Sequence, residues 1–123
     1  MRVKRPADGL VWGESGRAAI PFLRRGRVLL GLGDPAGAPG DRISVVWRLR
    51  DLAEQEGRDP AVWRAGPELL KIYADLGLTG LPLGQDGLPE SAERQPPGGL
   101  YLVCVAERDL GPLIPLLPDP TKE

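Results

Sequence analysis

The chain has 123 residues, the usual size of one domain, and its 41% hydrophobic and 27% charged residues are ordinary values for a globular protein. It contains no His and a single Cys, Cys104. This composition excludes His-based acid–base catalysis, Cys/His zinc sites and intrachain disulfides. We therefore expect no cofactor and no metal site, and the 17 Gly and 14 Pro indicate irregular structure in local segments.

The net charge of −1 conceals two oppositely charged halves. Residues 1–50 carry ten basic and four acidic side chains, a net charge of +6, whereas residues 51–123 carry six basic and thirteen acidic ones, a net charge of −7. The basic half suits an anionic partner such as nucleic acid or a lipid surface, but two opposite halves also attract each other or a second copy. We favour the self-directed interpretation, which predicts a homodimer.

Two further features concern origin and location. Thirteen of the 16 basic residues are Arg and Asn is absent, a composition typical of a thermophile or a high-GC genome. The N-terminal segment MRVKRPADGLVWGE contains no apolar run of signal-peptide length, and nowhere do about 18 apolar residues run together. The sequence therefore predicts a cytoplasmic protein without a transmembrane segment.

The first part of the chain predicts three short strands and one helix. The strands, separated by glycines at which the backbone turns easily, are expected at residues 10–12, 17–23 and 27–32. Two prolines and three glycines then predict a loop over residues 33–40, after which Asp41 is the expected N-cap. Residues 42–56 place their apolar side chains on one helical stripe, and Gly57 ends this helix.

The second part predicts shorter elements. A strand is expected at residues 59–65, and a second helix begins with Pro67 at its first position and ends at Gly77. Further strands are expected at residues 81–83 and 100–106, a mobile loop at 84–99 and a Leu/Pro-rich tail at 110–123 without a long helix. The expected fold is a single α+β domain over residues 1–123, with a mainly antiparallel sheet and two principal helices.

Several short motifs carry a resemblance to a known family. They are GRVLLGLGDPAG (26–37), WRLRDLA (47–53), Gly57, Pro60, YADLGL (73–78) and LG (83–84). In this order and spacing, over roughly residues 9–87, the chain resembles the first half of the C-terminal domain of the lysylphosphatidylglycerol synthetase family. The resemblance implies half of a tandem acetyltransferase-like fold (GNAT-like), from a domain that transfers an aminoacyl group from tRNA to a lipid head group.

The chain departs from this family after its last motif. In the family, the Leu-Gly pair leads into acidic residues and a basic segment of the second half, where the principal catalytic positions lie, whereas here Gln85, Asp86 and Gly87 lead into the expected loop. No catalytic residue is therefore carried over, and the membrane segments that usually precede the domain are missing. We expect a non-catalytic interaction or assembly module. The alternative is an aminoacyl- or acyltransferase-like enzyme that needs a second half or a dimer partner.

One candidate site is a glycine loop between a strand and a helix N-terminus, where amide groups can bind a phosphate. Its glycines are Gly31, Gly33 and Gly37. Their spacing misses the dinucleotide pattern by one residue, no Gly-Lys-Ser/Thr follows, and Asp34 and Asp41 would repel a phosphate. Arg27 also lies one residue too far from Gly31 for the coenzyme A pattern of acetyltransferases. We favour a structural turn.

A second candidate is a basic cluster at the connection between two expected strands. Its members are Arg24, Arg25 and Arg27, with Arg17 nearby. Arginine suits bidentate binding of a phosphate on tRNA, a nucleotide or an anionic lipid. The alternative, which we favour, is a solvated turn that keeps a sheet edge from aggregating.

The remaining chemically distinctive side chains have structural interpretations. Trp12, Trp47 and Trp63 lie on three separate elements, which favours core or interface roles over a nucleic-acid stacking platform. Cys104 lies within an apolar strand and, with no His to activate it, is expected to be a buried, inert thiol. Glu54 and Glu56 are expected on the solvated face of a helix.

Overall fold

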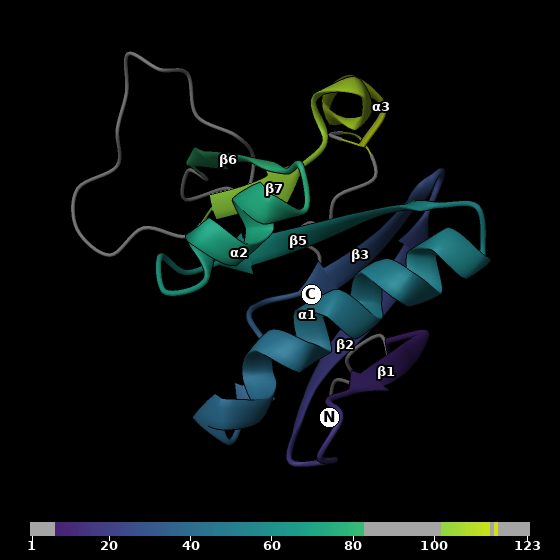
Figure 1. The fold of residues 1–123 in the computed structure, drawn as a ribbon. Coiled ribbons are helices and arrows are strands. Elements are labelled where there is room, and N and C mark those ends of the chain that lie inside the picture. The colour runs from purple at the N-terminus through teal and green to yellow at the C-terminus, as the bar shows by residue number, and fades with distance from the viewer. Residues whose placement is uncertain (1–6, 83–101, 114, 116–123) are drawn as a thin grey trace, which may run out of the picture.

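The computed structural model describes residues 7–82, 102–113 and 115 (Figure 1). Strands β1 (Gly9–Trp12), β2 (Ala18–Arg25), β3 (Val28–Leu32) and β4 (Ala36–Gly37) precede helix α1 (Pro39–Gln55). Strand β5 (Asp59–Ala65), helix α2 (Leu70–Asp75) and strands β6 (Thr79–Pro82) and β7 (Leu102–Val105) follow. A 3₁₀ turn, η1 (Glu107–Asp109), continues into the short helix α3 (Leu110–Leu113).

The strands form one mixed sheet in the order β1-β2-β3-β5-β7-β6, with β4 paired to β2. Strands β3 and β5 run parallel, and the other described pairs are antiparallel. Helix α1 makes the crossover that this parallel pair requires. The α+β class and the three-strand meander are thus confirmed, and the sheet is mixed, with β1 and β6 as the edges of the described part.

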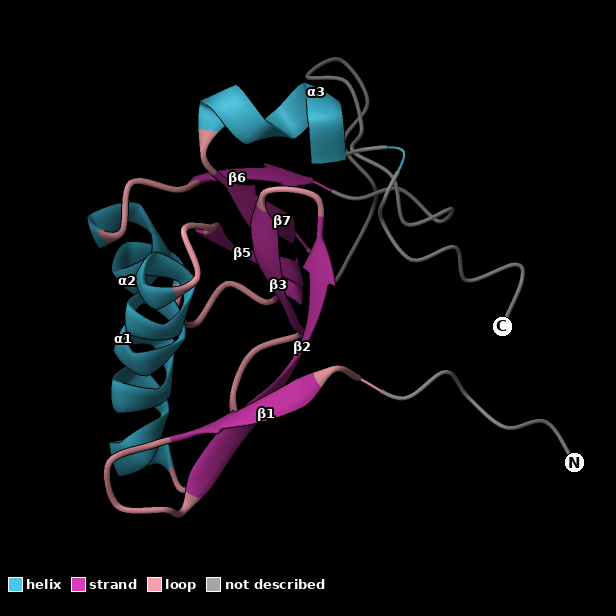
Figure 2. Ribbon diagram, turned by 90° about the vertical axis from the view of Figure 1, so that its right-hand side faces the viewer, coloured by secondary structure: helices cyan, strands magenta, loops and turns pink. Residues whose placement is uncertain are grey.

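Helices α1 and α2 cover one face of this sheet, as Figure 2 shows. The core beneath them joins α1 to β2, β3, β5 and α2 through fully buried residues such as Ile20, Leu29, Leu49 and Tyr73. A second cluster lies on the opposite face over β3, β5 and β7, and includes Leu30, Val103 and Leu113 of α3. Both clusters centre on the inner strands, which leaves the outer strands to be held by other contacts.

Helix α1 begins earlier than the sequence indicates. Its N-cap is Ala38, and Pro39 takes the first helical position, where its missing N–H leaves no bond unmade. The assignment of Asp41 as the N-cap is therefore wrong, because Asp41 lies inside the first turn and is buried. The helix ends where Gly57 adopts a φ of 69°, as predicted.

The later elements match their predicted bounds to different degrees. Strand β5 has the predicted bounds, and its pairing with β7 shifts between Val62 and Ala65, where Arg64 has a φ of 62°. The second helix begins at Leu70, so the placement of Pro67 at its first position is wrong: residues 67–69 form a turn before it. The predicted loop at 84–99 lies outside the described residues, as does most of the tail.

Candidate functional site

The two predicted anion-repelling residues are Asp34, in the loop after β3, and Asp41, in the first turn of α1, and each carboxylate has protein donors. Asp34 accepts a hydrogen bond of 2.6 Å from the hydroxyl of Tyr73 and one of 2.8 Å from the backbone N–H of Gly66. Burial, and then this hydrogen bond to Asp34, raise the pKa of the Tyr73 hydroxyl above its usual range. Asp34 thereby joins the end of β3 to the end of β5 and to α2.

Asp41 makes a similar connection between the first turn of α1 and the β1–β2 turn. Its buried carboxylate accepts backbone N–H bonds from Ser15 and Arg17 at 2.9 Å and from Ala18 at 3.1 Å, and a hydroxyl bond from Ser44 at 3.0 Å. The Ser15 bond is the largest cause that lowers the pKa of Asp41 to about 2. Asp41 therefore fixes the β1–β2 turn against the first turn of α1.

The three glycines of the loop have steric roles. Gly31 lies within β3, where a Cβ atom would meet Ile20 at 2.6 Å. Gly33 and Gly37 have φ values of 91° and 131°, which disfavour other residues. A Cβ atom on Gly37 would also lie 2.3 Å from the backbone oxygen of Arg17. These contacts supply a structural reason for each glycine; whether the loop binds an anion stays a prediction.

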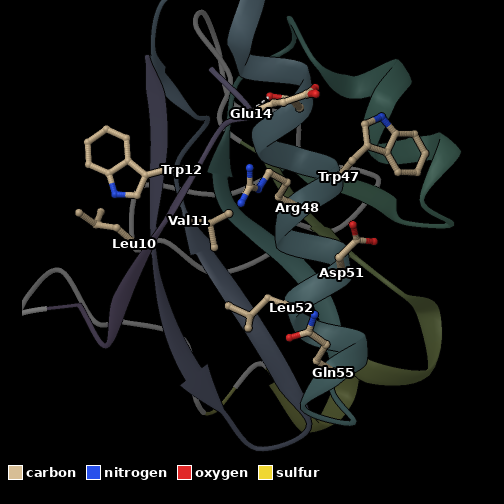
Figure 3. A pocket seen from close by; sticks show the side chains of 10 residues that line it. Leu10, Val11, Trp12, Glu14, Trp47, Arg48, Asp51, Leu52 and Gln55 are labelled. Atoms are coloured by element: carbon tan, nitrogen blue, oxygen red, sulfur yellow. Dashed lines mark hydrogen bonds between the residues drawn. The ribbon is translucent and has the colours of Figure 1, made fainter. Parts of the chain in front are cut away.

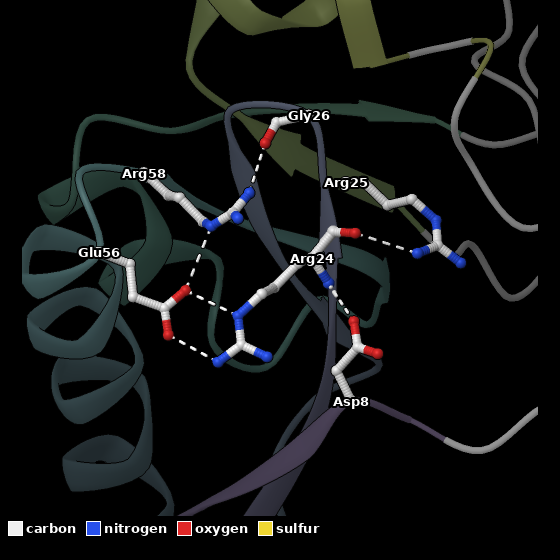
Figure 4. A network of polar contacts seen from close by, with 6 residues as sticks. All are labelled: Asp8, Arg24, Arg25, Gly26, Glu56 and Arg58. Atoms are coloured by element: carbon white, nitrogen blue, oxygen red, sulfur yellow. Dashed lines mark hydrogen bonds and ion pairs between the residues drawn. The ribbon is translucent and has the colours of Figure 1, made fainter.

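The basic cluster contains one tightly held arginine, shown in Figure 4. Arg24 donates to both carboxylate oxygens of Glu56, at 2.8 and 2.7 Å, and its guanidinium lies 5.2 Å from the centre of the Phe22 ring. Arg58 donates to the same carboxylate at 3.1 Å and to the backbone oxygen of Gly26. The Arg24 bond is the largest cause that lowers the pKa of Glu56.

This pairing ties the β2–β3 turn to the end of α1. Glu56 is thus more than a solvated side chain, contrary to the expectation from the sequence, because two arginines from other segments converge on it. The turn is also not at a sheet edge, since β2 lies between β1 and β3. Arg24 therefore has a structural role in the described part of the chain.

The other members of the predicted cluster are arranged differently. The guanidinium of Arg25 donates to the backbone oxygen of Arg24 at 3.0 Å, and Arg27 is exposed in the turn itself. Arg17 lies at the opposite end of β2, seven residues from Arg24, a separation of about 23 Å at about 3.3 Å per residue. Arg24, Arg25 and Arg27 therefore lie at the β2–β3 turn, where Arg24 and Arg25 point to opposite sides (Figure 4), and Arg17 lies elsewhere.

A carboxyl pair on the opposite face of the sheet was missed by sequence reasoning. Arg108 binds Asp59 at the start of β5 through two bonds of 2.9 and 2.5 Å. The neighbouring Asp109 is only 3% exposed, and burial, together with its hydrogen bond to Asp59, raises its pKa to about 6. These residues fasten η1 and α3 to the sheet. The two segments are 50 residues apart, so no local pattern joins them.

A groove of about 810 Å³ lies between β1 and α1. It is lined by Leu10, Val11, Trp12, Glu14, Ser44, Trp47, Arg48, Asp51, Leu52 and Gln55. In Figure 3, Val11 and Arg48 point into the space between the strand and the helix, whereas Leu10 and Trp12 project from β1 away from α1. Leu10 and Trp12 are 54% and 52% exposed, the two most exposed large hydrophobic residues of the described chain.

Trp47, Trp63 and Cys104 are less exposed than Trp12. Trp63 is buried in the second core cluster, and Trp47 is half-buried with the Arg50 guanidinium 5.0 Å from its ring. Burial is the main cause that raises the pKa of Cys104 to about 12, so this buried thiol stays protonated and inert near neutral pH. Within residues 7–82, 102–113 and 115, no three acidic or Cys side chains converge as a metal site would require.

The same described segments contain no helix that is long and apolar enough to span a membrane. The family model for the C-terminal region of phosphatidylglycerol lysyltransferase matches residues 4–93. The lysylphosphatidylglycerol biosynthesis bifunctional protein LysX of Mycobacterium avium (strain 104) is 32% identical over 89 residues, which are 72% of this chain and 8% of LysX. LysX of Mycobacterium ulcerans (strain Agy99) is 32% identical over 84 residues, or 68% of this chain and 8% of that protein.

Two solved structures share the fold. One is the C-terminal domain of a protein described as a lysylphosphatidylglycerol synthetase from Agrobacterium fabrum, with a TM-score of 0.59 and 33% identity, covering 62% of this chain and 24% of that one. The other is L-PGS from Bacillus licheniformis, with a TM-score of 0.57 and 28% identity, covering 61% of this chain and 23% of that one. The chain thus spans about a quarter of each of these structures.

Proposed function

Because the chain belongs to the phosphatidylglycerol lysyltransferase C-terminal family, we propose that it is a non-catalytic assembly module of such a transferase. In this proposal, the chain supplies a folded surface onto which further domain elements, in the same polypeptide or another, assemble the reaction centre. The observation that carries the proposal is that the reactive side chains Cys104, Tyr73 and Arg24 are buried or bonded within the fold. We further propose that the fold corresponds to half of a tandem acetyltransferase-like domain.

The chemistry of the described side chains supports this proposal. Aminoacyl transfer needs a group that can move a proton near neutral pH and donors that stabilise an oxyanion. The Cys104 thiol is buried and protonated, and the Tyr73 hydroxyl donates to Asp34. Arg24 is held by Glu56. These three groups therefore serve the fold.

The alternative is that the chain is itself a transferase once it is completed by a second half or a dimer partner. The observation that favours it is the exposure of Arg27 in the β2–β3 turn, because an exposed arginine can contact an anionic donor such as aminoacyl-tRNA. If this alternative holds, the reaction takes place on the cytoplasmic side of a membrane, where aminoacyl-tRNA is available. We favour the module.

A transfer assay separates the two functions. The chain is incubated with lysyl-tRNA and phosphatidylglycerol vesicles, alone and together with a relative's C-terminal domain from which the segment matching this chain has been deleted. We expect no lysyl transfer from either protein alone and transfer from the mixture. Transfer by the chain alone, lost in Arg27→Ala and retained in the control Lys71→Ala, would establish the enzyme instead. Absence of lysyl transfer by the mixture would contradict the module.

The basic cluster is tested by binding. Substituting Arg24, Arg25 and Arg27 with Ser is expected to leave binding to tRNA and to anionic vesicles unchanged, because acidic residues of the same small protein offset the attraction within a screening length of about 8 Å. A strongly salt-dependent affinity that disappears in this variant would instead support the anionic-donor site of the alternative.

We also propose that the module self-associates as a homodimer. The opposite charges of its two halves and the exposed Leu10 and Trp12 support this proposal. Light scattering at several protein concentrations measures it directly. A mass that stays near 13.2 kDa at all of them would contradict it.

A further inference from the structure

Strand β1 ends the described sheet with backbone groups that have no neighbouring strand. The N–H of Gly13 donates to the backbone oxygen of Ala18 at 2.8 Å, so this is a hydrogen-bonded position of the β1–β2 ladder. Antiparallel ladders alternate hydrogen-bonded and non-hydrogen-bonded pairs. Val11 therefore directs its N–H and C=O toward β2, whereas Leu10 and Trp12 direct theirs outward, toward the open edge.

The side chains at these two positions are unusual for an open edge. Leu10 and Trp12 are more than half exposed and lie opposite Pro21 and Ala19 of β2, on the face away from α1. Natural proteins protect open edges by keeping them short or with Pro, Lys, inward-pointing charges or a bulge. Strand β1 is short, with four residues, but contains no Pro, Lys or charged residue, and its pairing with β2 is regular. Such an edge is a template for another strand.

We propose that this edge is the self-association interface of the chain, with β1 of one copy pairing antiparallel to β1 of a second copy across a two-fold axis at Val11. This register places Leu10 opposite Trp12 of the second copy, and Trp12 opposite Leu10. Both residues direct their backbone groups outward, so each symmetry-related pair exchanges both of its hydrogen bonds. The inference rests on the self-association proposed above and identifies the surface that carries it.

The arrangement of side chains favours a second copy over other occupants. In this register the exposed apolar side chains meet each other, Leu10 against Trp12, on the same face of a continuous sheet. On the α1 face, the groove beside β1 is bordered by charges of both signs, Arg48 with Glu14 and Asp51. In a two-fold pairing, the basic side chain of each groove approaches the acidic side chains of the second copy. A polyanion at the same groove would instead be repelled by the two carboxylates.

Substitutions at the edge test the proposal by light scattering and sedimentation. We expect the unmodified chain to approach twice 13.2 kDa with rising concentration. Trp12→Lys should weaken the dimer at least about tenfold, because it replaces the apolar contact with like charges across the axis. The matched control is Ile43→Lys, an equally exposed apolar position on α1 outside the groove, which should dimerise normally. Circular dichroism checks that both variants are folded.

A cysteine cross-link tests the register. Val11 lies on the proposed two-fold axis in a non-hydrogen-bonded pair, where the two Cα atoms are about 4.5 Å apart, within the range of a disulfide. Val11→Cys is therefore expected to give a covalent dimer under mild oxidation. The control Thr79→Cys, on the opposite edge, should not, and the buried native Cys104 should not react.

The outcomes separate this inference from the proposal on which it rests. A monomeric unmodified chain would overturn both. A dimer that is insensitive to Trp12→Lys and gives no Val11→Cys cross-link would overturn the β1 interface and leave self-association standing through another surface. Dimerisation that is lost in Trp12→Lys, together with the cross-link, supports both.

Discussion

The two edges of the sheet are built differently. Edge strand β1 has Leu10 and Trp12 exposed and contains no Pro. Edge strand β6 contains Gly80 and ends at Pro82, residues that weaken or block pairing with a further strand. Exposure of an edge strand is therefore not enough to make a binding surface. Of these two edge strands, β1 has the composition that favours pairing with another strand.

Each side of the sheet is also attached by one carboxylate of the loop after β3. Asp41 reaches toward β1 and holds the β1–β2 turn, whereas Asp34 reaches toward α2, which packs against β6. The glycine loop that resembles a phosphate site is, in the described structure, the junction between the two sides. This comparison predicts that a substitution which disrupts the contacts of one of these two carboxylates leaves the other side of the sheet folded.

The largest expected effect comes from Gly13→Ala, on the β1 side. A Cβ atom there would lie 2.2 Å from a carboxylate oxygen of Asp41, so the β1–β2 turn or the carboxylate must move. We expect a loss of about 3 kcal/mol in the free energy of unfolding, the upper part of the usual range for overpacking. Urea denaturation measures it.

The matched control for this prediction is Gly40→Ala in α1, where an added Cβ meets nothing within 4 Å. It should be neutral or slightly stabilising, since Ala favours a helix over Gly by about 1 kcal/mol. Equal stability of Gly13→Ala and the unmodified chain would show that Asp41 does not hold the turn.

A smaller loss is expected from Tyr73→Phe, on the β6 side. This change removes the 2.6 Å hydrogen bond to Asp34 from a buried position. Hydrogen bonds to charged groups contribute about 1.5–3 kcal/mol, so we expect a loss of about 2 kcal/mol in denaturation experiments. The exposed Asp75→Asn in the same helix is the control, and an equal effect of both variants would contradict the assignment of Asp34 as the anchor of α2.

A pH dependence is expected at the third attachment, where α3 joins β5. The folded pKa of Asp109 is raised to about 6, so its contribution to stability is present below its unfolded pKa of about 4 and is lost as pH rises through about 6. Asp41, with a folded pKa of about 2, has the opposite dependence: its contribution is present above about 4 and is lost as pH falls through about 2.

Thermal denaturation between pH 4 and 7 measures the Asp109 dependence. Asp109→Asn cannot titrate, so we expect this variant to lose the part of the decline above pH 4 that the unmodified chain shows. The variant Asp75→Asn should keep that decline. An unchanged profile in Asp109→Asn would contradict the role of the carboxyl pair.

Local patterns in the sequence were enough to predict the main elements. The apolar stripe of residues 42–56 predicted α1, and the β-forming run at 59–65 predicted β5 with its observed bounds. These predictions succeed because helix and strand periodicities are local properties of the chain. The family motifs added the correct family, since they lie in the same order as in its C-terminal domain.

The side-chain connections could not be predicted in the same way. Asp41 matched the pattern of an N-cap but folds back to amides 23 to 26 residues earlier, and Asp34 binds Tyr73 39 residues later. Glu56 has the pattern of a solvated helix residue and instead binds Arg24. Such bonds depend on the order of strands in the sheet, which a local pattern does not contain.

The position of β1 at an exposed edge likewise could not be predicted from the sequence. The run Leu10 to Trp12 predicts a strand but not its place in the sheet. The strand is placed last in the sheet by its pairing with β2 alone, which leaves two of the three side chains exposed. Only the topology distinguishes a core strand from an interface strand here.

The measurement that tests the account most directly is amide hydrogen exchange at β1, followed residue by residue by NMR over a range of protein concentrations. The account predicts that the amides of Leu10 and Trp12 exchange fast in dilute solution and become protected as the dimer forms, while the amide of Val11, already bonded to β2, is protected throughout. Exchange of Leu10 and Trp12 that is independent of concentration, in a chain that light scattering shows to be dimeric, would contradict it.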